Sequence, residues 1–292
     1  MTEEEALARA VNLPCWEHPN RPEILGGGIT NFNVKISDGD KTYVVRIGDD
    51  IPVHGILRWH ELMICRAAHA AGMTPAVYYH EPGALVLDFI EAKTFAEDDV
   101  RDPSNLLRIV DLVRRCHRDV QPHLRGPVLT FWVFHVLRDY ATTLREGASS
   151  HVSRLPDLLS TADQLEAAVG PIDVVLGHND LLAANILDDG TRLWLIDWEY
   201  AGFNTPLFDL GGLATNNGLS EPQERQILEH YFEGSADSYW RAYTAMKCAS
   251  LMRETMWSMV SEIHSTLEFD YSEYTAENMS RLEKALADFR NT

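Results

Sequence analysis

The chain of 292 residues is long enough for one large domain or for two lobes that share a cleft. Hydrophobic residues make up 45% and charged residues 24% of it, which is ordinary for a globular protein and excludes a disordered chain. The 44 acidic and 25 basic side chains give a formal net charge of −19. Such a charge repels nucleic acid and anionic membranes, so neither is expected as a partner. It mildly favours a cationic ligand, although the charge alone is better explained by solubility.

The cysteines and the N-terminal segment indicate the cellular compartment. The four cysteines are far apart in the sequence, so no CxxC pair or zinc knuckle is expected, and they are typical of free thiols in a reducing compartment: Cys15, Cys65, Cys116 and Cys248. The acidic N-terminus lacks the pattern of a signal peptide, and no apolar run is long enough for a membrane span. We therefore expect a cytoplasmic protein without membrane insertion. The sequence does not indicate its oligomeric state.

The first ninety or so residues are predicted to be mostly β-structure. Apolar residues alternate with polar ones at Phe32, Val34 and Ile36, and a turn-forming segment at 37–40 then leads into a second apolar run, which is typical of a hairpin. Gly72 marks the end of a segment with helical spacing of apolar residues. The expected elements are strands over 31–37 and 42–47, a helix over 54–71, and strands over 76–80 and 84–90.

The pattern changes to helical periodicity after residue 91. The expected helices span 106–119, 131–145, 155–169 and 238–264, with a last one from about 274. Two short apolar runs, at 172–176 and 193–196, interrupt them. The sequence therefore predicts an α+β protein, with a small sheet-rich lobe over 1–91, a hinge near 88–92, and a larger helical lobe over 92–292.

The residues best suited to chemistry follow the two short apolar runs. Asp180 lies on a loop after the first run, Asn185 comes five residues later, and Asp197 ends the second run. If the two short strands pair as a hairpin, a carboxylate, an amide and a second carboxylate converge. Mg²⁺ accepts such oxygens and keeps waters, and phosphoryl transfer needs a metal for the phosphates and a carboxylate for the attacking hydroxyl. A surface hairpin would explain one such Asp, but not two spaced motifs.

These motifs resemble those of kinases. The segment His178-Asn179-Asp180, followed by Asn185 five residues after Asp180, resembles the kinase catalytic loop. Asp197 stands where kinases carry the metal-binding Asp-Phe-Gly. The longer pattern, which continues from Asp197 through Trp-Glu-Tyr-Ala-Gly, resembles the choline/ethanolamine kinase family and its bacterial relatives. The resemblance extends over about 25–289 and implies a protein-kinase-like two-lobed fold of the kind that aminoglycoside phosphotransferases share.

The family resemblance implies roles for the residues of this loop. Asp180 would be the catalytic base, and Asn185 and Asp197 would hold Mg²⁺. His178 would support the loop, and Asp209 would brace it by accepting backbone hydrogen bonds. ATP and Mg²⁺ are the cofactors that this resemblance implies.

A second group of residues, in the first lobe, would hold ATP. Arg46 stands where protein kinases use Lys, and choline kinases are similar in carrying Arg there; its guanidinium can hold phosphate oxygens bidentately. Glu61, on the following helix, would pair with Arg46 and complete the catalytic set. The remaining nucleotide contacts are expected from a glycine-rich segment and the hinge: Gly26, Gly27, Gly28, Asn31, Asp88 and Ile90.

A third group of residues would line the substrate pocket by the same resemblance: Glu199, Tyr200, Glu254, Trp257, Tyr271 and Tyr274. An ammonium group over such rings gains about 0.5–2 kcal/mol. Trp257 is explained equally well as core packing, and for Phe269 core packing is the better explanation. Glu254 stands where animal choline kinases carry another aromatic residue, so the resemblance leaves the substrate open.

The function implied is ATP-dependent phosphorylation of the hydroxyl of a small amino alcohol, with choline or ethanolamine favoured. The alternatives are a kinase for another small cationic substrate, such as an aminoglycoside or thiamine, and a nucleotide-binding pseudokinase. The segment 254–274 does not resemble that of aminoglycoside or thiamine kinases, which argues against the first alternative. A pseudokinase would lack the base or a metal ligand, and none is missing here. A protein kinase would need an Ala-Pro-Glu-like segment after Asp197, and the sequence has none.

Overall fold

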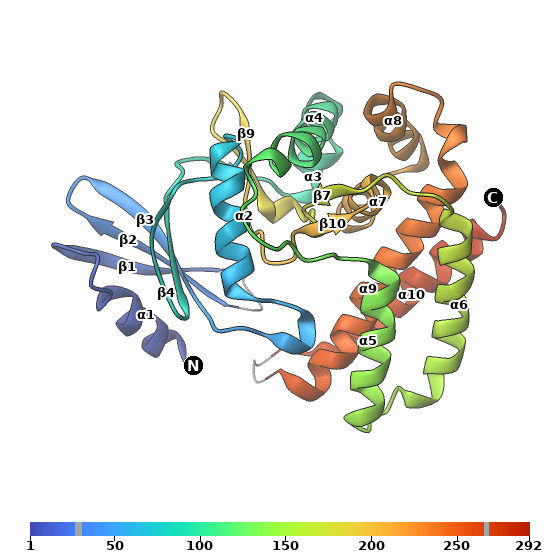
Figure 1. The fold of residues 1–292 in the computed structure, drawn as a ribbon, viewed down its shortest axis with the longest axis horizontal. Coiled ribbons are helices and arrows are strands. Elements are labelled where there is room, and N and C mark those ends of the chain that lie inside the picture. The colour runs from blue at the N-terminus through green and yellow to red at the C-terminus, as the bar shows by residue number, and fades with distance from the viewer. Residues whose placement is uncertain (27–30, 266–268) are drawn as a thin grey trace.

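The structure is a computed structural model that describes residues 1–26, 31–265 and 269–292. A sheet-rich part lies at one end of the molecule and a group of helices at the other (Figure 1). This arrangement confirms the predicted α+β organisation.

The N-terminal part is built on a five-stranded antiparallel sheet. Its strands, in spatial order, are β1 (Pro19–Leu25), β2 (Phe32–Asp38), β3 (Lys41–Ile47), β5 (Ala84–Asp88) and β4 (Val77–Glu81). The hairpin predicted from the alternating residues is β2–β3, and Gly39 in its turn has a φ of 59°. Successive side chains of a strand point to opposite faces, so Leu85 and Leu87 belong to one core cluster and Val86 to another.

A helix covers each face of this sheet. Helix α2 (Arg58–Ala70) packs in the same cluster as Leu85 and Leu87, and α1 (Glu3–Val11) packs in the cluster of Val86. Sequence reasoning did not predict α1, although Thr2 and Glu5 form a capping box at its start.

The start of α2 also differs from the prediction. The chain forms a separate 3₁₀ turn over Pro52–His54, and Gly55 ends it with a φ of 71°. A left-handed residue cannot continue a helix, so α2 begins only at Arg58.

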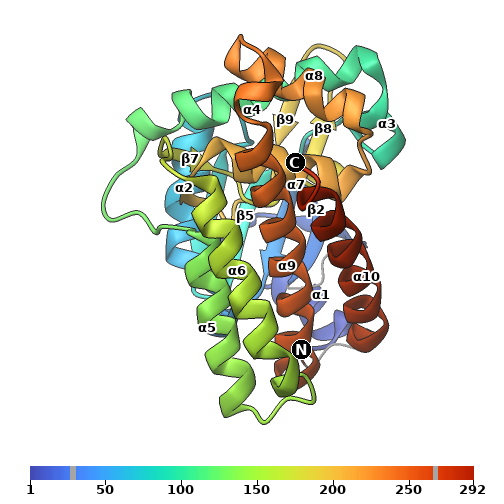
Figure 2. The ribbon, with the colours of Figure 1, turned by 90° about the vertical axis from the view of Figure 1, so that its right-hand side faces the viewer.

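The C-terminal part consists of helices around one buried helix. They are α3 (Glu97–Arg101), α4 (Pro103–Asp119), α5 (Val133–Glu146), α6 (Leu155–Val169), α7 (Pro206–Asn217), α8 (Glu221–Phe232), α9 (Trp240–His264) and α10 (Tyr271–Phe289). Helix α9 packs against α5, α6, α7 and α10, and Figure 2 shows it between α6 and α10. Of its 25 residues 17 are buried, as expected for a helix that has neighbours on most sides.

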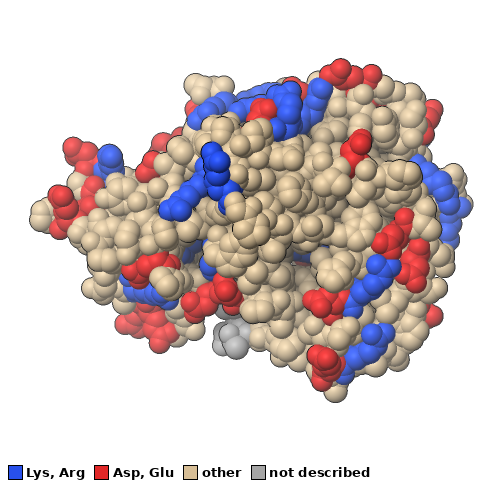
Figure 3. All heavy atoms as spheres, viewed as in Figure 1, with Lys and Arg blue, Asp and Glu red and all other residues tan. Residues whose placement is uncertain are grey.

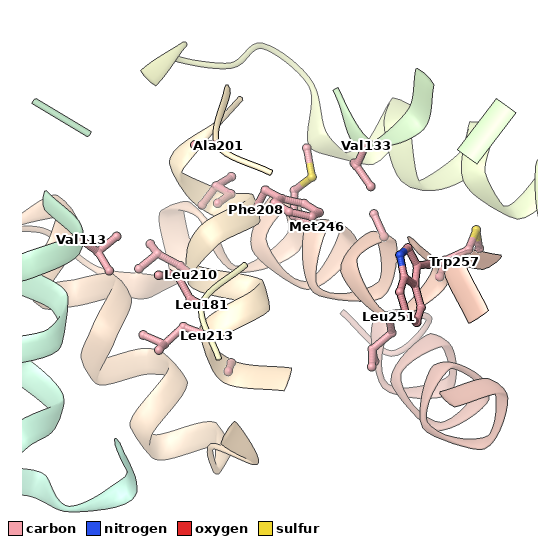
Figure 4. Close-up of a cluster of buried hydrophobic side chains, with 14 of the residues drawn as sticks. Val113, Val133, Leu181, Ala201, Phe208, Leu210, Leu213, Met246, Leu251 and Trp257 are labelled. Carbon is pink, nitrogen blue, oxygen red and sulfur yellow. The ribbon is translucent and has the colours of Figure 1, made fainter. Parts of the chain in front are cut away.

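The core around α9 is apolar and large. Figure 4 shows Phe208 of α7, and Met246, Leu251 and Trp257 of α9, in one cluster of buried side chains. Helix α10 begins three residues earlier than predicted, at Tyr271, because the Asp270 side chain accepts a hydrogen bond from the backbone of Glu273 and caps the helix.

The pairing of the short strands differs from the prediction. Strand β7 (Val175–Gly177) pairs with β10 (Gly202–Asn204), whereas β9 (Leu193–Leu195) pairs with β8 (Ile186–Asp188), which also pairs with β6 (Lys93–Thr94). The two apolar runs therefore do not form the hairpin that was considered from the sequence. The turn at Asp188–Gly190 joins β9 to its nearest neighbour in sequence instead, and β7 finds its partner beyond Asp197.

The larger core cluster continues from the helices of the C-terminal part to α2 and β5 of the N-terminal part. Because the apolar core is continuous across residue 91, the packing does not mark a boundary there, and the division into two lobes at this residue stays a prediction.

Among the described residues, no helix has the length and hydropathy of a membrane span. The face in Figure 3 mixes acidic and basic side chains, with acidic ones prominent over the N-terminal part at the left.

Candidate active site

The loop after β7 is held by one buried carboxylate. Asp209, on α7, accepts hydrogen bonds from the backbone N–H groups of His178 (2.8 Å) and Asn179 (2.7 Å), as expected from the sequence. The imidazole Nε2 of His117 lies 2.8 Å from the same carboxylate. Asn179 has a φ of 65°, a left-handed conformation that needs such external support. These contacts hold Asp180 at the end of the loop.

The three residues singled out from the sequence converge on this loop. The backbone N–H of Ile196, next to Asp197, donates to the carbonyl of Asn185 at 3.0 Å. The Asn185 side chain donates from Nδ2 to the carbonyl of Asp180 at 2.9 Å. The ring of His178 lies 2.9 Å from the carbonyl of Ile196, so it supports the loop from within. The pairing of β8 with β9 therefore brings the amide next to the second carboxylate, and the Asn185 side chain links both to the loop of Asp180.

A buried ion cluster lies beside Asp197. Arg46 contacts Asp197 at 2.8 Å, Glu61 at 3.1 Å and Glu199 at 3.2 Å, so the predicted Arg46–Glu61 pair is confirmed. Arg58 contacts Glu61 at 2.7 Å and Glu199 at 3.0 Å. We call these five residues the Arg46 cluster. It joins β3 and α2 of the N-terminal part to the segment that follows β9.

Sequence reasoning missed Arg58. Its one local signal is the spacing of three residues to Glu61 on a helix, where side chains meet. The Glu199 carboxylate, which was expected in the substrate pocket, contacts Arg46 and Arg58, and its part in the pocket stays a prediction.

The charges of the site shift the ionisation of its carboxyl groups. Burial raises the pKa of Asp180 to about 8, with Asp197 and Glu254 adding to the rise and Arg253 opposing it. Burial also raises the pKa of Asp197, but the charge and hydrogen bond of Arg46 outweigh it and hold this pKa below its usual value. The two carboxyl groups thus differ in their ionisation: the pKa of Asp180 is raised and that of Asp197 is lowered.

The donor set fits a magnesium ion. The Nδ2 of Asn185 is engaged with Asp180, which leaves the amide oxygen as the coordinating atom, and Asp197 supplies an ionised carboxylate. Mg²⁺ takes one or two protein oxygens and completes its shell with water and phosphate. No group of three or more His, Cys, Asp or Glu that could hold a metal exists in the described part of the chain, so an all-protein metal cage is absent there.

The aromatic residues predicted for the substrate pocket form two contacting groups. Trp257 donates from Nε1 to the hydroxyl of Tyr200 at 3.0 Å, and the ring of Tyr271 lies 6.0 Å from that of Trp257. Tyr274 instead donates its hydroxyl to Glu254 at 2.8 Å. The interpretation of Phe269 as a core residue is wrong, because 44% of it is exposed.

Sequence reasoning also missed Arg253. Its guanidinium lies over the ring of Tyr200, 4.3 Å from the centroid, and its Nη1 donates to Glu254 at 2.8 Å. Nothing in the local sequence distinguishes this arginine from an exposed one, because the ring beneath it comes from a distant segment.

The residues expected to contact the nucleotide lie along the sheet. Gly26 follows β1 and Asn31 precedes β2, while Asp88 ends β5 and Ile90 lies just beyond it. Gly27 and Gly28 lie outside the described residues.

A sheet-rich part and a helical part, with a carboxyl group, an amide and a second carboxylate between them, define a small-molecule kinase of the protein-kinase-like fold. The family model described as "Choline/ethanolamine kinase" matches residues 23–217. The chain belongs to the choline/ethanolamine kinase family.

Individual relatives agree with this assignment. Protein LicA of Haemophilus influenzae is 26% identical over 273 residues, which cover 90% of this chain and 79% of LicA. A probable ethanolamine kinase of Arabidopsis thaliana is 27% identical over 291 residues, with 86% of this chain and 76% of the relative covered. A choline/ethanolamine kinase family protein from Mesorhizobium loti is similar in structure, with a TM-score of 0.78, 25% identity, and 98% and 95% of the two chains covered.

The fold extends beyond this family. The spectinomycin phosphotransferase APH(9)-Ia has a TM-score of 0.62 at 14% identity, with 95% of this chain and 94% of that chain covered. This likeness shows the shared fold alone and confirms the predicted relation to aminoglycoside phosphotransferases.

Replacing Asp209 by Ala should destabilise the protein. Two buried backbone N–H groups and His117 would lose their acceptor, and each unsatisfied buried donor costs about 1–3 kcal/mol, so we expect a loss of about 3 kcal/mol or more in the free energy of unfolding. Urea unfolding followed by circular dichroism measures this. Asp163→Ala, whose side chain is 68% exposed, is the control and should change the free energy by less than about 0.5 kcal/mol. Equal unfolding midpoints for the two variants would contradict the role of Asp209.

Proposed function

We propose that the protein transfers the γ-phosphoryl group of ATP to the hydroxyl of a small amino alcohol, with choline and ethanolamine as the first candidates. The observation that carries this proposal is the convergence of Asp180, Asn185 and Asp197 beside the buried Arg46. The names of the relatives support it, since several are ethanolamine kinases, and a structure of the neighbour LicA holds AMP.

The roles of the residues follow from their surroundings. Asp180 orients the hydroxyl of the substrate and accepts its proton as the oxygen bonds to phosphorus. Arg46, which Glu61 positions, binds phosphate oxygens of ATP, because a guanidinium is a bidentate partner for phosphate. Asn185 and Asp197 hold Mg²⁺, which neutralises charge on the phosphates.

The remaining nucleotide and substrate contacts are part of this proposal. Backbone groups of the segment that includes Gly26, Gly27, Gly28 and Asn31 approach the phosphates, and backbone groups near Asp88 and Ile90 contact adenine. Tyr200, Trp257, Tyr271, Tyr274 and Glu254 form the wall of the substrate pocket.

We place this activity in the cytoplasm. Four free cysteines support a reducing compartment, and three of them are buried: Cys65, Cys116 and Cys248.

A screen of ATP consumption tests the proposal. Choline, ethanolamine, their partly methylated intermediates, thiamine and an aminoglycoside are offered separately with Mg-ATP. We expect ATP turnover with one or more amino alcohols and only background turnover with thiamine and the aminoglycoside. Preferred turnover of thiamine or the aminoglycoside would overturn the amino-alcohol assignment. Binding of Mg-ATP without turnover of any substrate would favour a pseudokinase.

Replacing Asp180 by Asn should remove the base while keeping the fold. We expect turnover on the best substrate to fall by a factor on the order of 10² or more, because a positioned base contributes on that scale. The affinity for Mg-ATP, measured by calorimetry, should stay close to that of the wild type. Near-normal turnover of the variant would show that another group accepts the proton.

Replacing Asp197 by Ala should remove the magnesium dependence of ATP binding, because the phosphates lose the ion that links them to the protein. Calorimetric titrations with ATP in the presence of Mg²⁺ and of EDTA measure it. Asp237→Ala is the matched control, since its side chain is 82% exposed. If Asp197→Ala binds Mg-ATP as tightly as this control does, Asp197 is not a magnesium ligand.

A further inference from the structure

A cation of the protein itself occupies the aromatic wall of the substrate pocket. The Arg253 guanidinium lies 4.3 Å from the ring centroid of Tyr200 and 5.7 Å from that of Phe131, and only 5% of Arg253 is exposed. A ring face attracts a cation through its quadrupole, and one face in this geometry accommodates one cation. The face of Tyr200 that Arg253 covers is thus closed to an ammonium ligand.

The other aromatic residues leave little ring surface for a ligand. Trp257 is 4% exposed and Tyr271 is 6% exposed, and the Nε1 of Trp257 is already bonded to Tyr200. A trimethylammonium group has no N–H bond, so it depends on ring faces and on unscreened negative charge for its binding. Arg253 removes the first of these and counteracts the second.

The charge of Arg253 is only partly neutralised. One carboxylate, Glu254, accepts a hydrogen bond from its Nη1, whereas its buried Nε and Nη2 have no hydrogen-bond partner among the described residues. A ligand cation in the pocket therefore meets repulsion from Arg253, whatever its degree of methylation. Such a ligand binds only if other contacts compensate for the repulsion.

Glu254 offers this compensation to one kind of ammonium group. Its oxygens accept from Arg253 and Tyr274, but a carboxylate has about four acceptor sites, and 22% of this side chain is exposed. An ammonium group with N–H bonds can donate to the free sites in a charge-assisted hydrogen bond. A quaternary ammonium group has no donor and gains only the weaker attraction of charge.

We propose that Arg253 and Glu254 together make the site selective for amino alcohols whose ammonium group carries N–H bonds, and that they exclude the trimethylammonium group. This inference rests on the proposed function. It assigns ethanolamine or a similar primary amino alcohol, rather than choline, as the substrate.

Steady-state kinetics on the full chain test the inference with ethanolamine, its N-methyl and N,N-dimethyl forms, and choline. We expect kcat/KM to fall with each added methyl group, with choline about tenfold or more below ethanolamine, as a lost charge-assisted hydrogen bond predicts. Arg253→Met removes the charge and the planar group that lies over Tyr200, and it should raise kcat/KM for choline relative to ethanolamine about tenfold, because a trimethylammonium group can then use the ring face. Arg253→Lys keeps the charge and should keep the preference.

Two further variants separate selectivity from folding. Arg241→Met is the matched control, because Arg241 also lies over a ring, 5.0 Å from the centroid of Phe289, and is on the same helix as Arg253 but about 18 Å away along its axis; it should leave the preference unchanged. Glu254→Gln keeps the packing and should lower kcat/KM for ethanolamine more than that for choline, because choline loses only the attraction of charge and ethanolamine also loses a charge-assisted hydrogen bond. This variant decides the question even if Arg253→Met does not fold.

The outcomes distinguish this inference from the proposed function. If the wild type uses choline as well as ethanolamine, or if neither Arg253→Met nor Glu254→Gln changes the ratio of their kcat/KM values, the inference is wrong while the kinase assignment stands. If no member of the series is phosphorylated, both are wrong. If kcat/KM of the wild type falls with each added methyl group and this fall is smaller in Arg253→Met, the result supports both the inference and the kinase assignment.

Discussion

The salt bridges of Arg46 to Asp197 and Glu61 are the interactions on which the rest of the site depends. Arg46 is buried on a central strand of the sheet. Transfer of a cation from water to the protein interior is unfavourable unless carboxylates surround it there. Three carboxylates do so, one from α2 and two from the segment after β9. The cost of burying these charges therefore fixes the distance between the sheet, α2 and the residue that would hold the metal.

A second buried arginine, Arg253, is also stabilised by its neighbours, but by fewer charges. Arg253 is buried like Arg46, but two aromatic rings and one carboxylate contact it instead of three carboxylates. The protein thus buries one cation among three carboxylates and a second cation that a single carboxylate contacts. Under the proposed function, the first lies beside the phosphates of ATP, and the second sets a condition on the cationic substrate.

Much of this site could be predicted from the sequence because its residues lie in short motifs with fixed order. Asp180, Asn185 and Asp197 lie within one segment, and the helical spacing of α2 places Glu61 within reach of Arg46. The pairing of β7 with β10 could not be predicted, because three-residue strands carry too little periodicity to choose a partner. Arg253 escaped notice for a related reason, since its environment comes from Tyr200 and Phe131, far away in the chain.

Helix α9 has a consequence for how this enzyme can evolve. Its middle carries Arg253, Glu254 and Trp257, which line the proposed substrate pocket, yet the same turns carry Met252 and Met256 of the core. A mutation that broadens the range of substrates therefore alters a helix on which the packing of four neighbouring helices depends. New substrate preferences on this scaffold would have to arise together with compensating substitutions in α5, α6, α7 or α10, which makes specificity here slow to drift and informative about ancestry.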